Sequence, residues 1–196
     1  MSGETKRLFL AFDLSIEVVN ALVEARRPLV EKLKERSRKV QPVRPELIHL
    51  TLKFLGDTPT ALIPRLMGEM EEVCEPLFSF DVGVAKVGVF PSSGPPRIAW
   101  AGIDDEGAEV LSLLHRNVDE ELHERLGLDK ERRPFKPHIT LARMGGGAAV
   151  VEEWMEDCAK REFGRSPIRE LALMASELGP EGPHYEVLRR FALGSQ

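Results

Sequence analysis

Hydrophobic and polar positions alternate along the chain in short stretches, and these stretches are separated by longer ones with helical spacing. Period-two alternation indicates strands, and apolar residues three or four positions apart indicate helices. The pattern predicts strands at 7–13, 47–55, 78–90, 97–103, 138–143, 168–178 and 184–193, and helices at 16–36, 60–75, 106–126 and 149–162. Strands with one polar face that alternate with helices favour an α+β fold with antiparallel sheets.

The order of these elements repeats on either side of one loop. Residues 91–97, "PSSGPPR", contain the turn-forming residues that mark a loop, and they lie near the middle of the chain. Each half then reads strand, helix, His-x-Thr strand, helix, strand. We therefore expect residues 1–196 to form a single domain of two similar lobes. Two antiparallel sheets with flanking helices would be related by a pseudo-two-fold axis around a central groove.

Two strands share an unusual motif, "IHLTLKFLG" and "PHITLAR". Residues i and i+2 of a strand point to the same face, so His49 shares a face with Thr51, and His138 shares one with Thr140. The apolar residues between them point the other way, into the core. By the same alternation we expect Lys53 on the histidine face.

Two imidazoles facing one another suit paired acid–base chemistry. A histidine titrates near pH 6.5, so one ring can be neutral while the other is protonated. Threonine hydroxyls can donate hydrogen bonds to an anion held between the rings. Phosphate is the natural anion here, because the second motif lies in a basic stretch that contains Arg132, Arg133, Lys136 and Arg143 against Glu131.

Composition limits the possible partners. The formal net charge is −5, whereas proteins that grip duplex DNA without specificity are usually basic. No stretch approaches the roughly 18 apolar residues of a membrane span, and two isolated cysteines fit a reducing compartment. We therefore expect a cytoplasmic protein with no duplex DNA or membrane as partner.

The paired "HLTL" and "HITL" motifs resemble those of the two-histidine (2H) phosphoesterase superfamily. The chain is most similar to the RNA 2′,3′-cyclic phosphodiesterases, also called 2′-5′ RNA ligases. The likeness covers most of the chain and includes the stretches "RLFLAFDLS", "RPELIHLTLKFLGD", "VGVFPSSGPPRIAWAGI" and "ERRPFKPHITLAR".

This resemblance implies a bilobed α+β fold and hydrolysis of a terminal 2′,3′-cyclic phosphate to a 2′-phosphate without a metal or other cofactor. Weak, reversible 2′-5′ RNA ligation is expected as well. The implied partners of the protein, which we expect to be a monomer, are RNA ends or small cyclic nucleotides. His49 and His138 match the catalytic positions together with Thr51 and Thr140, and Arg143 matches a phosphate-contacting arginine. In a regular strand Arg143 would face away from His138, so a bulge or a strand end is needed to bring it in.

Residue reasoning alone leaves the roles and some alternatives open. We expect His138 to act as the base and His49 as the acid, although symmetric motifs do not label their roles. The alternatives are a metal hydrolase, a non-enzymatic RNA-end binder, and a phosphodiesterase of the same type acting on another cyclic phosphate or a 2′-5′ oligonucleotide. A metal hydrolase is disfavoured because no third ligand shows the local spacing of known zinc motifs.

Overall fold

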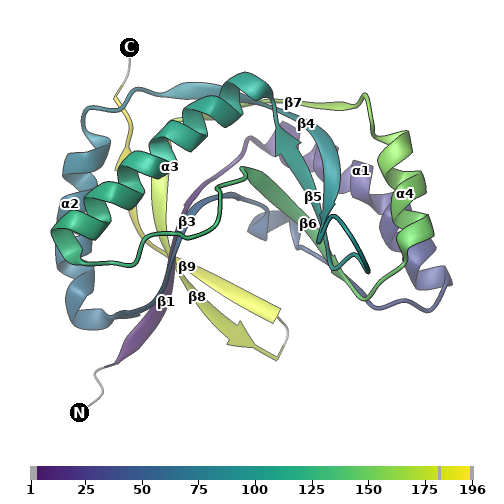
Figure 1. Ribbon diagram of the computed structural model, residues 1–196, viewed down its shortest axis with the longest axis horizontal. Helices are drawn as coiled ribbons and strands as arrows, with labels where there is room; N and C mark the ends of the chain where they lie inside the picture. The colour runs from purple at the N-terminus through teal and green to yellow at the C-terminus, as the bar shows by residue number, and fades with distance from the viewer. Residues whose placement is uncertain (1–3, 181, 195–196) are drawn as a thin grey trace.

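The computed structural model describes residues 4–180 and 182–194, which form an antiparallel nine-stranded sheet flanked by helices (Figure 1). Along the sheet the strands follow the order β7-β4-β5-β6-β3-β1-β8-β9, and β2 pairs with β6. The bounds are β1 (Thr5–Phe12), β2 (Val40–Pro42), β3 (Leu50–Pro59), β4 (Phe80–Phe90), β5 (Ile98–Ile103), β6 (His138–Met144), β7 (Glu162–Ile168), β8 (Glu170–Gly179) and β9 (Gly182–Ala192). The two expected antiparallel sheets are thus joined into one.

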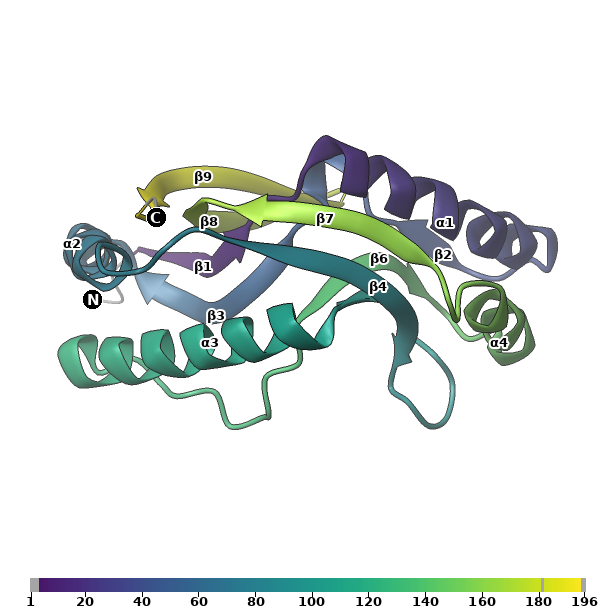
Figure 2. The same ribbon diagram turned by 90° about the horizontal axis from the view of Figure 1, so that it is seen from above.

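The helices cover the sheet in two pairs, and each pair takes one helix from each half of the chain (Figure 2). The helices are α1 (Ile16–Glu35), α2 (Ile63–Cys74), α3 (Asp105–Leu126) and α4 (Ala148–Asp157), with short 3₁₀ turns at Pro45–Leu47 and Thr60–Leu62. Helix α1 packs on β6, β7 and α4, whereas α3 packs on β3, β4 and α2. Each side of the molecule is therefore assembled from both halves of the sequence. The division into two similar lobes within one domain stays a prediction.

Most predicted elements are confirmed, although the strand expected at 47–55 runs from Leu50 to Pro59, so that His49 directly precedes it. Two other differences are larger. The helix expected at 149–162 ends at Asp157, and residues 162–168 instead form β7, which pairs with β4. Gly164 and Pro167 disguise this strand in the sequence, because both residues are unfavourable inside a sheet. Their presence is tolerated because β7 lies at the sheet edge. The short strand β2 was also missed. Within the described residues, no helix is both long and apolar enough to cross a membrane.

The two faces of β1 bury different side chains. Phe12 belongs to the large core between the sheet and the helices, whereas Phe9 lies on the opposite face. There Phe9 packs in a small cluster with Ala11, Ala172 and Met174, against which Tyr185 is packed. Of these two phenylalanines, Phe9 is therefore the one on the sheet face away from the large core, where its ring lies beside that of His49.

Candidate active site

The two His-x-Thr strands meet at the centre of the sheet. Strands β3 and β6 run antiparallel, and Leu50 pairs with Ile139 at the point where they join. Each of these residues lies between the histidine and the threonine of its motif, so this pair joins the two motifs at their middle positions. Both side chains are fully buried. The core therefore anchors the two motifs side by side.

Each histidine ring is oriented by the backbone two residues before it. Nδ1 of His49 lies 2.8 Å from the carbonyl oxygen of Leu47, and Nδ1 of His138 lies 2.7 Å from that of Lys136. A carbonyl oxygen can only accept, so Nδ1 carries the hydrogen in both rings. In the neutral form, Nε2 then has the free lone pair. The hydroxyl of Thr51 lies 3.0 Å from Nε2 of His49 and can donate to it.

A β-bulge follows the threonine of the first motif. Opposite β1, Leu52 is an extra residue between Thr51 and Lys53, and this shifts the alternation of the strand. Lys53 is consequently buried with 4% exposure, while Phe54 is 59% exposed and its ring lies 6.0 Å from that of Phe9. The expectation that Lys53 lies on the histidine face was wrong because the bulge turns it into the interior.

The second motif has a bulge at the corresponding place. Opposite β5, Leu141 is the extra residue between Thr140 and Ala142. Ala142 is buried and Arg143 is exposed, so the bulge returns Arg143 to the side of the strand that carries Thr140. The positive charge of Arg143 acts to lower the pKa of Tyr185, which burial raises. The charge of Arg143 therefore acts on Tyr185, the neighbour of the first histidine.

Aromatic rings surround His49. The ring centroid of Phe9 lies 5.2 Å from that of His49, and the centroid of Tyr185 lies 5.4 Å away, edge to face. Burial lowers the pKa of His49 below its ordinary value of 6.5, and the positive charge of His138 contributes in the same direction. The carbonyl of Leu47 and the carboxylate of Asp13 oppose this shift without cancelling it. The neutral imidazole is therefore the favoured form of His49 near pH 7.

The lowered pKa of His49 should be visible by NMR. We expect its titration midpoint below 6.5, and we expect His138→Asn to raise it because one source of positive charge is removed. Since the folded state disfavours the proton, the contribution of His49 to stability is complete above pH 6.5 and declines as the pH falls through its folded pKa. The control is His123→Asn on α3, which should leave the midpoint of His49 unchanged. A midpoint at or above 6.5 would contradict this electrostatic description, as would a midpoint that responds to His123→Asn and not to His138→Asn.

A cavity of about 550 Å³ opens beside His49. Its polar lining includes Tyr185 and the ion pair between Asp13 and Arg190, whose atoms lie 2.6 Å apart. Its apolar lining includes Ile16 and Val187, both of which are exposed. This side of the site can therefore accommodate an uncharged, partly apolar group.

The surroundings of His138 differ from those of His49. The ring of Phe90 stands edge to face on His138 at 5.0 Å and lies 5.3 Å from the ring of Trp100. Trp100 pairs with Thr140 across β5 and β6, which places its indole on the histidine face. The indole lies against Gly88, where an added Cβ would come within 2.2 Å of the ring. Glycine at this position therefore leaves the space that the indole fills.

The structure brings the five predicted site residues to one face of the central strands, and their catalytic roles stay predictions. These residues are His49, Thr51, His138, Thr140 and Arg143. Sequence reasoning did not single out several neighbours: Asp13, Phe90, Tyr185 and Arg190. Tyr185 had one available signal, because it is the chain's single tyrosine. Within residues 4–180 and 182–194, no group of three or more His, Cys, Asp or Glu side chains could hold a metal ion.

Two histidines with matching tethers, joined at the centre of a curled antiparallel sheet, define a two-histidine phosphoesterase architecture. The chain belongs to the 2′-5′ RNA ligase superfamily, whose family model matches residues 20–180.

Individual relatives agree with this assignment. The chain is 33% identical over 185 residues to an RNA 2′,3′-cyclic phosphodiesterase of Archaeoglobus fulgidus, covering 94% of this chain and 99% of the relative. Among solved structures, TT0787 of Thermus thermophilus is similar with a TM-score of 0.80 and 35% identity, covering 95% of this chain and 97% of that one. Escherichia coli LigT complexed with 3′-AMP has a TM-score of 0.75 and 26% identity, covering 97% and 99%.

Proposed function

We propose that this protein hydrolyses the terminal 2′,3′-cyclic phosphate of RNA to a 2′-phosphomonoester by paired-histidine acid–base catalysis. The observation that carries the proposal is the pair of equivalent histidines joined through Leu50 and Ile139, each tethered through Nδ1. Tethering through Nδ1 leaves Nε2 of both rings as the proton-transferring atom. The related RNA 2′,3′-cyclic phosphodiesterases support the same substrate class.

The reaction needs one proton acceptor and one proton donor on opposite sides of the phosphorus. A water oxygen attacks phosphorus and loses a proton to the neutral ring, while the bond from phosphorus to the 3′ oxygen breaks. The protonated ring gives its proton to that departing oxygen. The product carries its phosphate on the 2′ oxygen, and the two histidines exchange protonation states.

The surroundings of the two histidine rings indicate which ring acts as the base and which as the acid. The lowered pKa of His49 favours the neutral ring, which suits the base, and so assigns His138 to the acid. In this proposal the roles are exchanged relative to the sequence-based expectation. The physical reason is the aromatic enclosure of His49 by Phe9 and Tyr185, which no local motif reveals.

Three further side chains are proposed to stabilise charge on the phosphate. The hydroxyls of Thr51 and Thr140 lie on the histidine face, and Arg143 reaches that side because of the bulge after Thr140. Hydrogen-bond donors fixed at the place where charge develops stabilise a transition state without reorganising. The buried leucines of the same two strands hold these hydrogen-bond donors in place.

One assay tests the function and separates it from its alternatives. RNA ending in a 2′,3′-cyclic phosphate is incubated with the protein and an excess of a strong chelator, and the position of the product phosphate is determined. We expect turnover at the unchelated rate and a 2′-phosphate product. Loss of activity with chelator, restored by a divalent metal, would indicate a metal hydrolase, and binding without turnover would indicate an RNA-end binder.

The same groups can run the reaction backwards. A 5′-hydroxyl in place of water would give a 2′-5′ linkage, so weak reversible 2′-5′ ligation belongs to the proposal. Its natural partners would be RNA ends or small cyclic nucleotides, and the relative LigT has been crystallised with 3′-AMP. The monomeric state and the cytoplasmic location stay predictions.

A further inference from the structure

A segment without helix or strand, residues 127–137, connects α3 to the second histidine. It begins at Gly127, which ends α3 in a left-handed conformation with φ of 68°. It finishes directly before His138, the first residue of β6. We call residues 127–137 the connecting segment.

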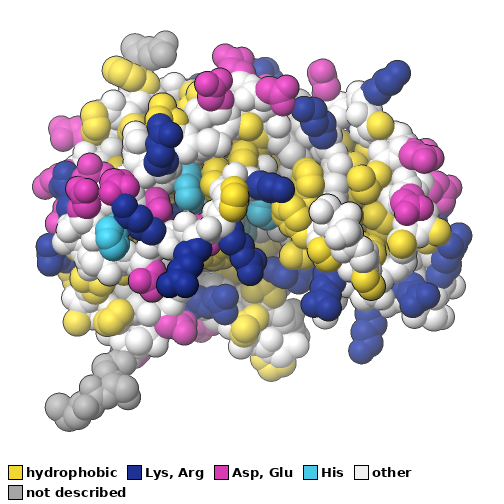
Figure 3. Space-filling view, viewed as in Figure 1, with side chains coloured by type: hydrophobic (Ala, Val, Ile, Leu, Met, Phe, Trp, Pro, Cys, Tyr) yellow, Lys and Arg dark blue, Asp and Glu magenta, His cyan; other side chains and the backbone are white. Residues whose placement is uncertain are grey.

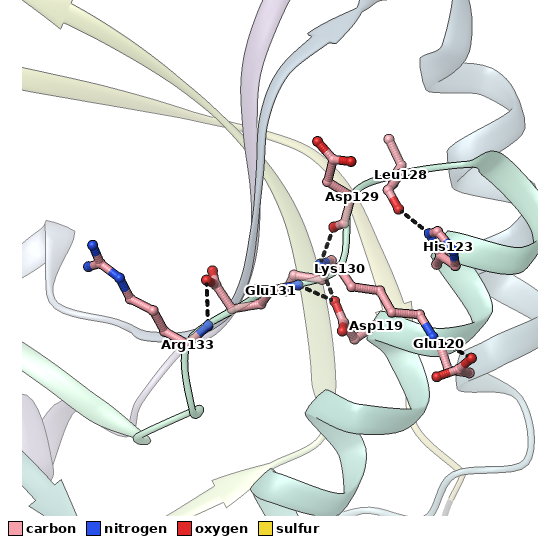
Figure 4. Close-up of polar contacts among 9 residues, drawn as sticks. Asp119, Glu120, His123, Leu128, Asp129, Lys130, Glu131 and Arg133 are labelled. Atoms are coloured by element: carbon pink, nitrogen blue, oxygen red, sulfur yellow. Dashed lines mark hydrogen bonds and ion pairs between the residues drawn. The ribbon is translucent and has the colours of Figure 1, made fainter.

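Polar contacts from α3 and from Lys53 of β3 hold the first half of the connecting segment (Figure 4). Each of these contacts ends on a backbone atom of the segment, so they fix the path of the chain rather than its side chains. They are His123 Nδ1 to the carbonyl of Leu128 at 2.9 Å, Lys53 Nζ to the carbonyl of Asp129 at 3.2 Å, and the backbone N–H of Glu131 to the carboxylate of Asp119 at 3.1 Å.

The second half of the connecting segment is tied to the helix and to the site. The ring of Phe135 stacks on His115 of α3, with centroids 4.3 Å apart and planes 7° apart. The carbonyl of Lys136 accepts the hydrogen bond from His138 that orients that ring. The segment is therefore a fixed rim of the active site on the His138 side.

Within this rim Lys130 is paired with Glu120, whereas the three cations nearer to His138 have no such partner among the described residues. The carboxylate of Glu131 accepts the backbone N–H of Arg133 at 3.3 Å. Arg132, Arg133 and Lys136 are exposed, and none forms an ion pair with a carboxylate of the described residues. Figure 4 shows the Arg133 side chain extending away from α3. Lys and Arg side chains also gather around the middle of this face of the molecule (Figure 3).

The six residues directly before the first histidine, 43–48, offer no such cluster. The one cation among them, Arg44, is close to Glu46, with 3.5 Å between their charged atoms. The cavity beside His49 is lined largely by apolar side chains. Among the described residues, the two sides of the site therefore differ, and the cluster of unpaired cations lies on the His138 side. For a chain of net charge −5, this local cluster is a surface suited to a polyanion.

We propose that Arg132, Arg133 and Lys136 bind the phosphates of the nucleotides that precede the cyclic terminus, so the protein selects RNA oligonucleotides over cyclic mononucleotides. This inference rests on the proposed function, because the catalytic histidines hold the terminal phosphate. RNA carries one phosphate per nucleotide, and because the backbone of the rim is already held in place, only the cationic side chains have to be ordered on binding. A cyclic mononucleotide has no preceding phosphate and cannot use these contacts.

The test compares two substrates that share the same reacting end. We measure kcat/KM for a cyclic mononucleotide and for a hexanucleotide that ends in the same 2′,3′-cyclic nucleotide, and we use the ratio of the two. The parent protein should prefer the hexanucleotide by roughly tenfold or more, with a preference that weakens as salt rises, since each phosphate contact releases counterions. The triple variant R132Q/R133Q/K136Q should lose most of that preference.

A second triple variant controls for the change in net charge. Lys34, Arg36 and Arg38 are exposed, lack an ion pair with any described carboxylate, and lie at the end of α1, away from the connecting segment (Figure 1). K34Q/R36Q/R38Q should keep the parent's ratio. The proposal is overturned if the parent has no preference, if the first triple variant keeps it, or if both triple variants lose it equally.

Binding measurements separate this inference from the proposed function. The affinity for a hexanucleotide that ends in a 2′-phosphate is measured by fluorescence anisotropy for the parent and both triple variants. If the parent turns over neither substrate, the proposed function fails. Weaker binding by R132Q/R133Q/K136Q alone would still support phosphate binding by the rim. Equal affinity in all three proteins overturns the proposal that the rim binds these phosphates, whatever the catalytic result.

Discussion

Replacing His49 or His138 with asparagine is expected to lower kcat/KM for a 2′,3′-cyclic phosphate substrate by about 10³-fold, within the range for loss of a general acid or base. Each ring occupies an equivalent place across the Leu50–Ile139 pair, so neither can take over the proton transfer of the other. The double variant should lose little more than either single one, because groups that act as a unit are not additive. Steady-state kinetics with chelator present measure all three.

The same substitution elsewhere provides the control. His123 is exposed on α3, and its hydrogen bond to Leu128 lies at the end of the connecting segment far from His138, so His123→Asn should leave kcat/KM within about twofold of the parent. Thermal unfolding of each variant separates catalysis from folding. Turnover within about threefold of the parent for either His49→Asn or His138→Asn would show that the ring is not a proton-transfer group.

The identity of the site could be predicted because its central parts are local in sequence. His49 and Thr51 lie two positions apart, as do His138 and Thr140, and alternation along a strand is enough to place each pair on one face. The recurrence of the motif at corresponding places then indicates that the pairs act together. Leu50 and Ile139, which join the strands, were correctly expected to be buried.

Features that depend on pairing between distant strands could not be predicted. The bulges at Leu52 and Leu141 appear only when the register with β1 and β5 is known, and they decide where Lys53 and Arg143 point. Tyr185 reaches His49 from a strand near the C-terminus. No local pattern encodes such contacts, since they follow from the order in which the strands assemble.

The bulge in β3 also creates a buried ion pair that ties the first motif to the rim of the second. The Lys53 side chain is 2% exposed and contacts the carboxylate of Asp119, which is 13% exposed. Burial raises the pKa of Asp119, but hydrogen bonds from Lys53 and from the backbone N–H of Glu131 outweigh it, so the net shift is downward. Lys53 stabilises the charge of Asp119 both by a hydrogen bond and by its positive charge, and a substitution can remove both.

Lys53→Met should lower the free energy of unfolding by about 3 kcal/mol, because it leaves a largely buried carboxylate without its partner. The double variant K53M/D119L removes both charges and should recover most of the loss, since buried pairs can be replaced by apolar residues at little cost. Urea unfolding of the parent, both single variants and the double variant gives the coupling energy directly.

The neighbouring ion pair between Lys130 and Glu120 is the matched control, because it joins the same helix and the same connecting segment (Figure 4). Its side chains are 41% and 50% exposed, so Lys130→Met should lower the free energy of unfolding far less than Lys53→Met does. If Lys53→Met costs no more than Lys130→Met, the buried pair is not what holds the connecting segment to β3. If K53M/D119L is no more stable than K53M, the loss comes from packing rather than from the uncompensated charge of Asp119.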